Sequence, residues 1–415
     1  MGVKVQQGSF TKSPNTAVPV TQTIAGVGFQ PRAVIFFWTR QTATGYAANE
    51  SMGFGFASGA ANQRSVAVES DDNQDTSNFS RIRSATNVIL MLERNATSGN
   101  NANLRARASF VSFNADGFQI NWGANENRAD IIHYIALGGD ITNAFVGDFP
   151  ASTAPGNQAV AGVGFQPDVV LFLNSTFNTA AEADTAVFSR KRFNLGMMNS
   201  AGQQWAISVC GRDNRNNPPH SLSQQRTDQV IASMTNNCTT TADSLASFVS
   251  MNAGGFTINW GNQASAAFPI YYLALRGGQH GLGSFNQAVA AGNQPVAGTG
   301  FNPNGLLLAS FNRVASTTIA ANSEVSIGAA SGTLARGTIW SETRDVDPTD
   351  ANMATITNRV IRLATSQTTN AEADLASFDS AGFTLNWNAV DATARQILYW
   401  AVGSGAPVVR WRELP

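Results

Sequence analysis

The sequence predicts an all-β protein built from three tandem homologous antiparallel β-sandwich domains. Three observations lead to this prediction. Two short phrases each occur three times, apolar residues alternate with polar ones at the period of a β-strand, and no stretch of the sequence has convincing helical periodicity. Jelly-roll topology is one of several sandwich topologies that fit these patterns.

The first repeated phrase marks the start of a buried strand. Residues 25–31, AGVGFQP, return unchanged at residues 161–167 and as AGTGFNP at residues 297–303, and their phenylalanines are equally spaced. An apolar stretch follows each copy, such as AVIFFW after the first. Glycine permits backbone angles that other residues avoid, and proline holds the residue before it extended. We therefore expect a turn that leads into a strand; a phosphate-binding loop would need a helix here.

The second repeated phrase also predicts a strand. Residues 108–122 read ASFVSFNADGFQINW and residues 246–260 read ASFVSMNAGGFTINW. Residues 376–387, ASFDSAGFTLNW, are interpreted as a shorter third copy. The recurrence of both phrases in one order indicates triplication of a whole domain.

Alternation within the second phrase assigns its tryptophans to the core. Phe118, Ile120 and Trp122 alternate with polar residues, which places the three side chains on one face of a strand. We expect Trp122 and its counterparts, Trp260 and Trp387, to be mostly buried. An exposed platform for sugar stacking is the alternative.

Glycines divide the chain into its three domains. They lie near residues 140 and 279, so the predicted domains span 1–140, 141–279 and 280–415, the last with a C-terminal tail. The junctions lack the long spacers of a flexible chain. We therefore expect a compact body that closes as a ring with approximate threefold symmetry, with the tail PVVRWRELP (407–415) ordered against a neighbour.

Composition argues against several classes of partner. Charged residues make up 13% of the chain and the net charge is −1, so nucleic acid and anionic membranes are not expected partners. The nearest approach to a basic cluster, SRKR from Ser189 to Arg192, is interpreted as a solvated loop. The first residues lack the apolar segment of a secretory signal, and no apolar run is long enough for a membrane helix.

No group of residues predicts catalysis. The three histidines, His133, His220 and His280, lie far apart in the repeats, and His133, which aligns with Tyr271, is interpreted as a packing or surface residue. Sequence motifs of hydrolases and metal sites do not occur. We expect a non-enzymatic protein with no catalytic, cofactor-binding or metal-binding residue and no cofactor.

Acidic residues follow the same strand in each copy. They are Asp71 with Asp72, Asp213, and Asp345 with Asp347. Oxygen ligands suit calcium, so a metal-binding loop is one interpretation. Aspartate is also frequent in turns at strand ends, and the turn is the interpretation that we favour.

The two cysteines, Cys210 and Cys238, are too few for a fold framed by disulfides. They fall in segments predicted to be neighbouring strands, where a bridge could form. Two buried free thiols are the interpretation that we favour.

Taken together, GFQP followed by an apolar strand, ASF..FNADGFQINW and YIALGG resemble repeat domains in structural proteins of tailed bacteriophages and prophages. The resemblance covers all three copies but rests on strand phrases, so it transfers no functional residue. It implies a component of the virion surface, made in the host cytoplasm: a capsid decoration protein, or a tail or fibre module. The implied partners are other virion proteins, such as the major capsid or tail protein.

Two functions fit the sequence. We favour a structural protein that stabilises the virion surface through protein–protein contacts, because the shared residues lie mostly on predicted core faces. The alternative is an array of modules that bind carbohydrates of the host surface or another host receptor, in which three linked copies would provide avidity.

Overall fold

The computed structural model describes residues 2–95, 101–175 and 183–405, and within them every regular element is a β-strand. The strands form six antiparallel sheets that pair into three sandwich-like units, which confirms the predicted fold class. The C-terminal tail, whose contact with a neighbour was predicted, lies outside the described residues.

The first repeat forms a sandwich of a large and a small sheet. Its large sheet has the order β1 (Val3–Thr11), β11 (Ile131–Gly139), β3 (Ala33–Thr39), β5 (Glu50–Gly59), β6 (Asn62–Ser70) and β7 (Phe79–Ser84). Its small sheet has the order β2 (Val20–Ala25), β10 (Gly117–Ala124), β9 (Asn103–Asn114) and β8 (Ile89–Glu93).

The other two repeats have the same strand order. The second has a large sheet of β12 (Asn143–Pro150), β22 (Pro269–Arg276), β14 (Val169–Asn174), β16 (Lys191–Asn199), β17 (Gln204–Gly211) and β18 (Ser221–Arg226), and a small sheet of β13 (Gly156–Val160), β21 (Gly255–Asn262), β20 (Ala242–Asn252) and β19 (Ile231–Met234). The third has a large sheet of β23 (Gln279–Asn286), β33 (Gln396–Gly403), β25 (Pro303–Ser310), β27 (Ser323–Ala330), β28 (Arg336–Arg344) and β29 (Asp350–Ile356), and a small sheet of β24 (Gly292–Ala297), β32 (Gly382–Ala389), β31 (Thr368–Asp379) and β30 (Ile361–Thr365).

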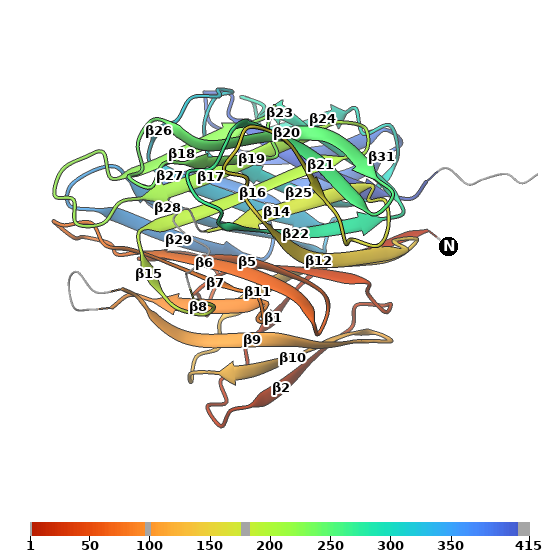
Figure 1. The fold of residues 1–415 in the computed structure, drawn as a ribbon, viewed down its shortest axis with the longest axis horizontal. Helices are drawn as coiled ribbons and strands as arrows, with labels where there is room; N and C mark the ends of the chain where they lie inside the picture. Colours follow the sequence, from red (N-terminus) through yellow and green to blue (C-terminus); the bar gives the residue numbers. More distant parts are fainter. Residues whose placement is uncertain (1, 96–100, 176–182, 406–415) are drawn as a thin grey trace, which may run out of the picture.

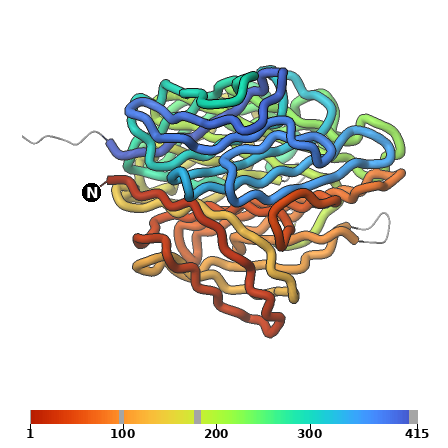
Figure 2. Tube along the Cα trace, turned by 180° about the vertical axis from the view of Figure 1, so that it is seen from behind, coloured from red at the N-terminus to blue at the C-terminus, as the bar shows by residue number. Residues whose placement is uncertain are grey.

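Each large sheet gains a seventh strand from another repeat. We call these strands the arms: β4 (Gly45–Ala48) of the first repeat pairs with β29 of the third, β15 (Phe188–Ser189) of the second pairs with β7 of the first, and β26 (Ala320–Ala321) of the third pairs with β18 of the second. The exchange is cyclic, so it closes the three repeats into the ring that the short junctions predicted. In Figure 1 the first repeat, red to orange, lies below the other two, and Figure 2 shows the third repeat, in blue, above it from behind.

A common apolar core lies between the three large sheets. It includes Phe37 and Phe54 from the first repeat, Trp205 from the second, and Leu307 and Trp400 from the third. Each sandwich also has its own core between its two sheets. The large sheets are therefore buried on both faces, which explains why their strands read as unbroken apolar runs such as AVIFFW.

The tryptophans of the second phrase are buried as predicted: Trp122, Trp260 and Trp387 are at most 1% exposed. The predicted register of the third copy is wrong, however. Ala108 lies opposite Trp122 and Ala246 lies opposite Trp260, but the residue opposite Trp387 is Ala373. The third copy therefore begins at Ala373, and its stretch before the glycine is as long as in the other two copies. The match of ASF at 376–378 is out of register.

The first phrase forms the predicted turn before a strand. Its two glycines, Gly26 and Gly28, have φ angles of 81° and 82°, and the corresponding glycines of the other copies also have positive φ. The carboxylate of Asp116 accepts hydrogen bonds from the N–H groups of both glycines. The repeated glycines thus serve the backbone of the turn.

Candidate functional site

The acidic residues that follow the same strand in each copy connect the repeats. In each copy the Oδ1 atom of one aspartate accepts a hydrogen bond from a backbone N–H at the start of β7, β18 or β29 of another repeat. Asp72 accepts from Ala351 (2.9 Å), Asp213 from Phe79 (2.6 Å) and Asp345 from Ser221 (3.1 Å). These bonds reach across to another repeat instead of closing the local turn that we favoured. Among the described residues, no group of three or more His, Cys, Asp or Glu side chains is placed to hold a metal ion.

A residue with left-handed backbone ends each arm. Asn49, Arg190 and Asn322 have φ angles of 62°, 71° and 71°. Their N–H groups donate to the carbonyl oxygens of Ala351, Phe79 and Ser221, the same residues whose N–H groups bind the aspartates. We call this the hinge position; asparagine tolerates it better than most residues.

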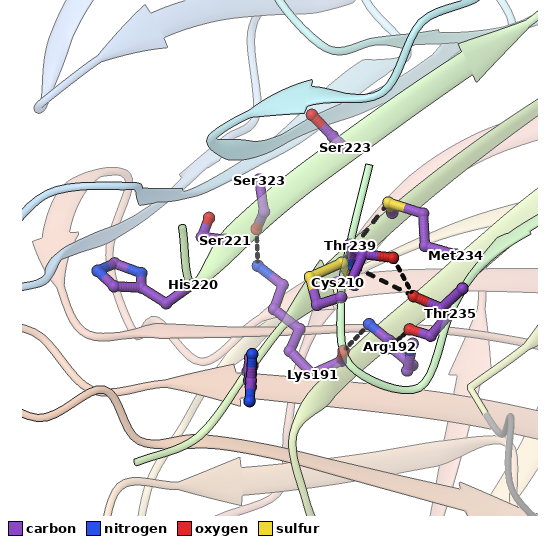
Figure 3. The surroundings of a disulfide bond; sticks show 12 residues. Lys191, Arg192, Cys210, His220, Ser221, Ser223, Met234, Thr235, Thr239 and Ser323 are labelled. Carbon is purple, nitrogen blue, oxygen red and sulfur yellow. Dashed lines mark hydrogen bonds between the residues drawn. A yellow bond between two sulfur atoms is a disulfide. The ribbon is translucent and has the colours of Figure 1, made fainter. Parts of the chain in front are cut away.

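The residues after the three hinges meet at the centre of the ring. Glu50, Lys191 and Ser323 form this axial cluster, and all three are 0% exposed. Lys191 Nζ forms an ion pair with Glu50 Oε2 and donates to Ser323 Oγ (2.5 Å), and Thr343 Oγ1 donates to the same Glu50 oxygen (2.6 Å). Figure 3 shows Lys191 reaching Ser323. Burial lowers the pKa of Lys191, and the charge of Glu50 opposes that effect.

The prediction of a solvated loop at residues 189–192 is wrong for the last two of them. Lys191 is 0% and Arg192 is 1% exposed. Arg190 occupies the hinge position, which turns the chain from the arm β15 into β16 and brings its neighbours into the contact between repeats. The basic character of this segment did not indicate that it is buried in the contact between repeats.

The three histidines do not converge on one site. His133 is buried as a packing residue, and its Nε2 atom lies 3.0 Å from Thr355 Oγ1 of the third repeat. His220 is buried beside Asp345, whereas His280 stacks on Trp400. Burial lowers the pKa of both His133 and His280 to about 4.

The cysteines form a disulfide, so the expectation of free thiols is wrong. Cys210 lies in β17 of a large sheet, and Cys238 lies in the turn after β19 of the small sheet, with their Cα atoms 5.7 Å apart. The two residues are not on neighbouring strands; the bond instead joins β17 of the large sheet to the turn that follows β19 of the small sheet. Figure 3 shows the bond at Cys210. Only the tertiary structure brings this turn beside β17.

A cleft of about 780 Å³ opens where the first repeat meets β29 of the third. It lies between residues 40–51, which include the arm, and the ends of β8 and β9. Charged side chains dominate its lining, among them Glu50, Glu69, Glu93, Arg94 and Arg105. We call it the Glu69 cleft. No sequence pattern points to Glu69, which looks like the end of an ordinary strand.

Most arginines of this cleft are neutralised. Arg40 pairs with Glu93 (2.8 Å) and Glu126 (2.9 Å), Arg105 also pairs with Glu93, and Arg128 pairs with Asp130 (2.6 Å). Glu69 differs, because it is 1% exposed and the polar group beside it is another carboxyl, that of Asp71. Its burial, and then the neighbouring Asp71 carboxyl, raise the pKa of Glu69 well above the usual range.

No model of a known protein family matches this chain, and no curated protein is significantly similar to it. The described residues contain no helix that is long and apolar enough to cross a membrane. The class that the structure defines is an all-β protein of three sandwich units.

Proposed function

We propose that this chain is a non-enzymatic structural protein of a bacteriophage virion, a surface decoration that stabilises the capsid or tail through protein–protein contacts. The observation that supports the proposal most directly is the cyclic exchange of the arms around one common core. One chain thereby presents three equivalent faces, as a homotrimer would. Such a body suits positions of threefold or near-threefold symmetry, which a symmetric assembly provides.

The outward faces of the small sheets suit contacts with other proteins. On the first repeat, Thr23, Gln119 and Asn121 are polar, uncharged and at least partly exposed. The corresponding positions of β21 hold Thr257 and Asn259. Charged residues are depleted at the centres of protein interfaces, so the uncharged edge that β2 and β10 form, and its counterpart in the second repeat, are the surfaces that we propose for contact with a capsid or tail protein.

The virion assignment itself rests on the resemblance of the repeated strand phrases to phage structural proteins. It can be tested on particles from a culture that expresses the chain. We expect the chain to sediment with intact DNA-containing particles in a density gradient, and an antibody against it to label their surface in electron micrographs. Absence from purified particles would contradict the proposal.

The alternative, an array of carbohydrate- or receptor-binding modules, would require a similar exposed cluster on each repeat. The three repeats differ at the position of Glu69, where the second has the disulfide-bonded Cys210 and the third has Glu342, which accepts a hydrogen bond from Ser366 N–H (2.7 Å). The Glu69 cleft therefore gives no support to three equal sites.

A further inference from the structure

We propose that the turn of residues 161–167 in the second repeat binds a carboxylate of another protein, from an acidic side chain or from a chain end. This inference does not depend on the proposed virion role. It is argued from a comparison of the copies, because the equivalent turn of the first repeat holds a carboxylate of this chain.

In the first repeat that carboxylate belongs to Asp116. Gly26 N–H donates to Oδ2 (3.0 Å) and Gly28 N–H donates to Oδ1 (2.5 Å), so each oxygen has its own donor. Backbone N–H groups that converge in a turn are common anion sites, and hydrogen bonds to a charged acceptor are stronger than those between neutral groups. The first turn is therefore a carboxylate site that the chain itself fills.

The second repeat has the same turn without the carboxylate. Asp116 is equivalent to Gly254, because in both repeats the glycine that follows pairs with the asparagine three residues before it. Gly162 and Gly164 have φ angles of 87° and 83°, close to those of their counterparts in the first repeat. The two N–H donors are thus kept, and only the acceptor is lost.

The contacts around the two turns also agree. The carbonyl oxygen of Asp116 accepts a hydrogen bond from Val27 N–H (3.4 Å), and that of Gly254 accepts one from Val163 N–H (3.0 Å). In both repeats the glutamine of the first phrase donates from its side chain to a carbonyl oxygen of the second phrase. The backbone of the second turn is therefore held in position without an aspartate side chain.

The N–H pair of the second turn is accessible. Gly162 and Gly164 are exposed, and neither N–H donates a hydrogen bond to any residue that the structure describes. A Cβ atom placed on Gly254 would have no neighbouring atom within 4 Å, so the room for a carboxylate is open. Asp168, directly after the phrase, is engaged elsewhere, since its Oδ2 atom accepts from Gly277 N–H (2.7 Å).

The third repeat does not offer the same pair. Ala381 lies at the position of Asp116, and its carbonyl oxygen accepts hydrogen bonds from Gly298 N–H (3.0 Å) and Thr299 N–H (3.2 Å). One of the two donors is therefore already used, and the proposed site belongs to the second repeat.

A carboxylate fits this pair because it has two oxygens, each of which can accept one of the two bonds, as in the first repeat. Water competes for exposed N–H groups, so a small free carboxylate should bind weakly. A carboxylate that belongs to a larger partner would also gain from the rest of the contact, and capture of a carboxylate by backbone N–H groups is a recurring mode of protein recognition.

NMR of the full chain, deuterated and with isotope-labelled glycine, can test the site. The probes are acetate, N-acetylglycine as a chain end and N-acetylaspartate amide as a side chain, each titrated against chloride at constant ionic strength and neutral pH. We expect the amide signals of Gly162 and Gly164 to shift along one saturating curve and those of Gly26 and Gly28 to stay in place. Tighter binding of one acetylated probe would identify the source of the carboxylate.

Substitutions at Gly254 provide matched variants. Its φ angle is not in the left-handed region, so Gly254→Asp fits the backbone and gives the second turn the carboxylate of the first. It should raise the Kd of acetate at least tenfold. Gly254→Ala brings no carboxylate and should leave this Kd unchanged.

The reverse change, Asp116→Ala, should open the first turn, so that Gly26 and Gly28 respond to acetate. If this variant does not fold, the natural chain and the two Gly254 variants decide the question. Shifts of Gly162 and Gly164 that do not saturate, that chloride produces equally, or that persist in Gly254→Asp would overturn the proposal.

Discussion

Glu50 and Lys191 come from different repeats and form an ion pair whose side chains are both fully buried at the centre of the ring. Each is the first residue beyond a hinge, so the strand exchange itself brings them together. Ser323, at the third equivalent position, is neutral and accepts a hydrogen bond from the same lysine. The centre of a nearly symmetric ring is thus asymmetric in charge.

Loss of one member of this pair should be more destabilising than loss of both. Lys191→Met leaves the Glu50 carboxylate buried without its cation, and we expect a loss of about 3–5 kcal/mol in the free energy of unfolding. Lys191→Met combined with Glu50→Gln removes both charges and should recover much of that loss. Denaturant unfolding of Lys191→Met, of Glu50→Gln and of the double variant gives the comparison. A double variant that loses as much stability as the two single variants together would contradict the coupling.

His133 should make the fold less stable in acid. Its pKa is lowered by burial to about 4, against about 6.5 in an unfolded chain. The unfolded chain therefore binds the proton first, so the contribution of neutral His133 is complete above pH 6.5 and is lost as the pH falls through 6.5 toward 4. The shift corresponds to roughly 3 kcal/mol at 1.36 kcal/mol per pKa unit.

The variant His133→Gln isolates this contribution, since glutamine does not titrate and can still form a hydrogen bond with Thr355. All other titrating groups are shared, so the difference in unfolding free energy between the two proteins should move in favour of the variant by that amount between pH 7 and pH 4. A difference that is constant with pH would show that His133 takes no part.

The disulfide should contribute to the stability of the second sandwich. Its cysteines are 28 residues apart, for which the loop-closure model gives about 3–4 kcal/mol. The double variant Cys210→Ala, Cys238→Ala should lose stability by up to this amount in denaturant unfolding. A reducing agent should destabilise the natural chain and leave the double variant unaffected; equal responses of the two proteins would argue against the bond.

Each tryptophan of the second phrase is fixed at its ring nitrogen by a glutamine of the neighbouring strand. Trp122, Trp260 and Trp387 donate from Nε1 to Gln22, Gln158 and Gln294, at 2.9, 2.7 and 2.7 Å. Trp260→Ala should cost about 3–5 kcal/mol, the usual loss for a buried aromatic side chain. Thermal unfolding measures it, and the same substitution at Trp122 and Trp387 should have a similar effect. Unchanged stability would contradict a core role.

The sequence predicted those features of the fold that depend on one repeat. Alternation in GFQINW placed Trp122 in the core correctly, and the glycines of AGVGFQP identified a turn whose backbone angles are now seen in all three copies. Both patterns are local, because strand period and backbone freedom are properties of neighbouring residues. The slip in register at residues 376–378 shows the limit, since a short phrase can recur by coincidence.

The contacts between repeats could not be predicted in this way. Glu50, Lys191 and Ser323 occupy equivalent positions but share no chemistry, so comparison of the copies does not reveal them. Asp213 was noticed, but its partner is a backbone N–H of another repeat, which leaves no trace in the sequence.

The ring also predicts that the chain can be opened at a different junction. The two ends of the described chain lie close together, since Val3 N–H donates to Ser404 Oγ (2.9 Å). The first strands of the first and third repeats also begin alike, because Val3 in β1 pairs with Gly139 of its own repeat as Gln279 in β23 pairs with Gly403. A circular permutant would run from residue 278 to 405, continue through a short glycine linker into residue 2, and end at residue 277.

We expect this permutant to fold to the same body, because it keeps every strand, every arm and the common core, and only moves the chain break from one junction to an equivalent one. A short flexible linker adds little loop-closure entropy. Its elution volume, circular dichroism and Tm should match those of residues 2–405 in the natural order, which serve as the control. A permutant that unfolds or elutes as a larger oligomer would show that the three junctions are not equivalent, and that the order of the repeats along the chain is needed to close the ring.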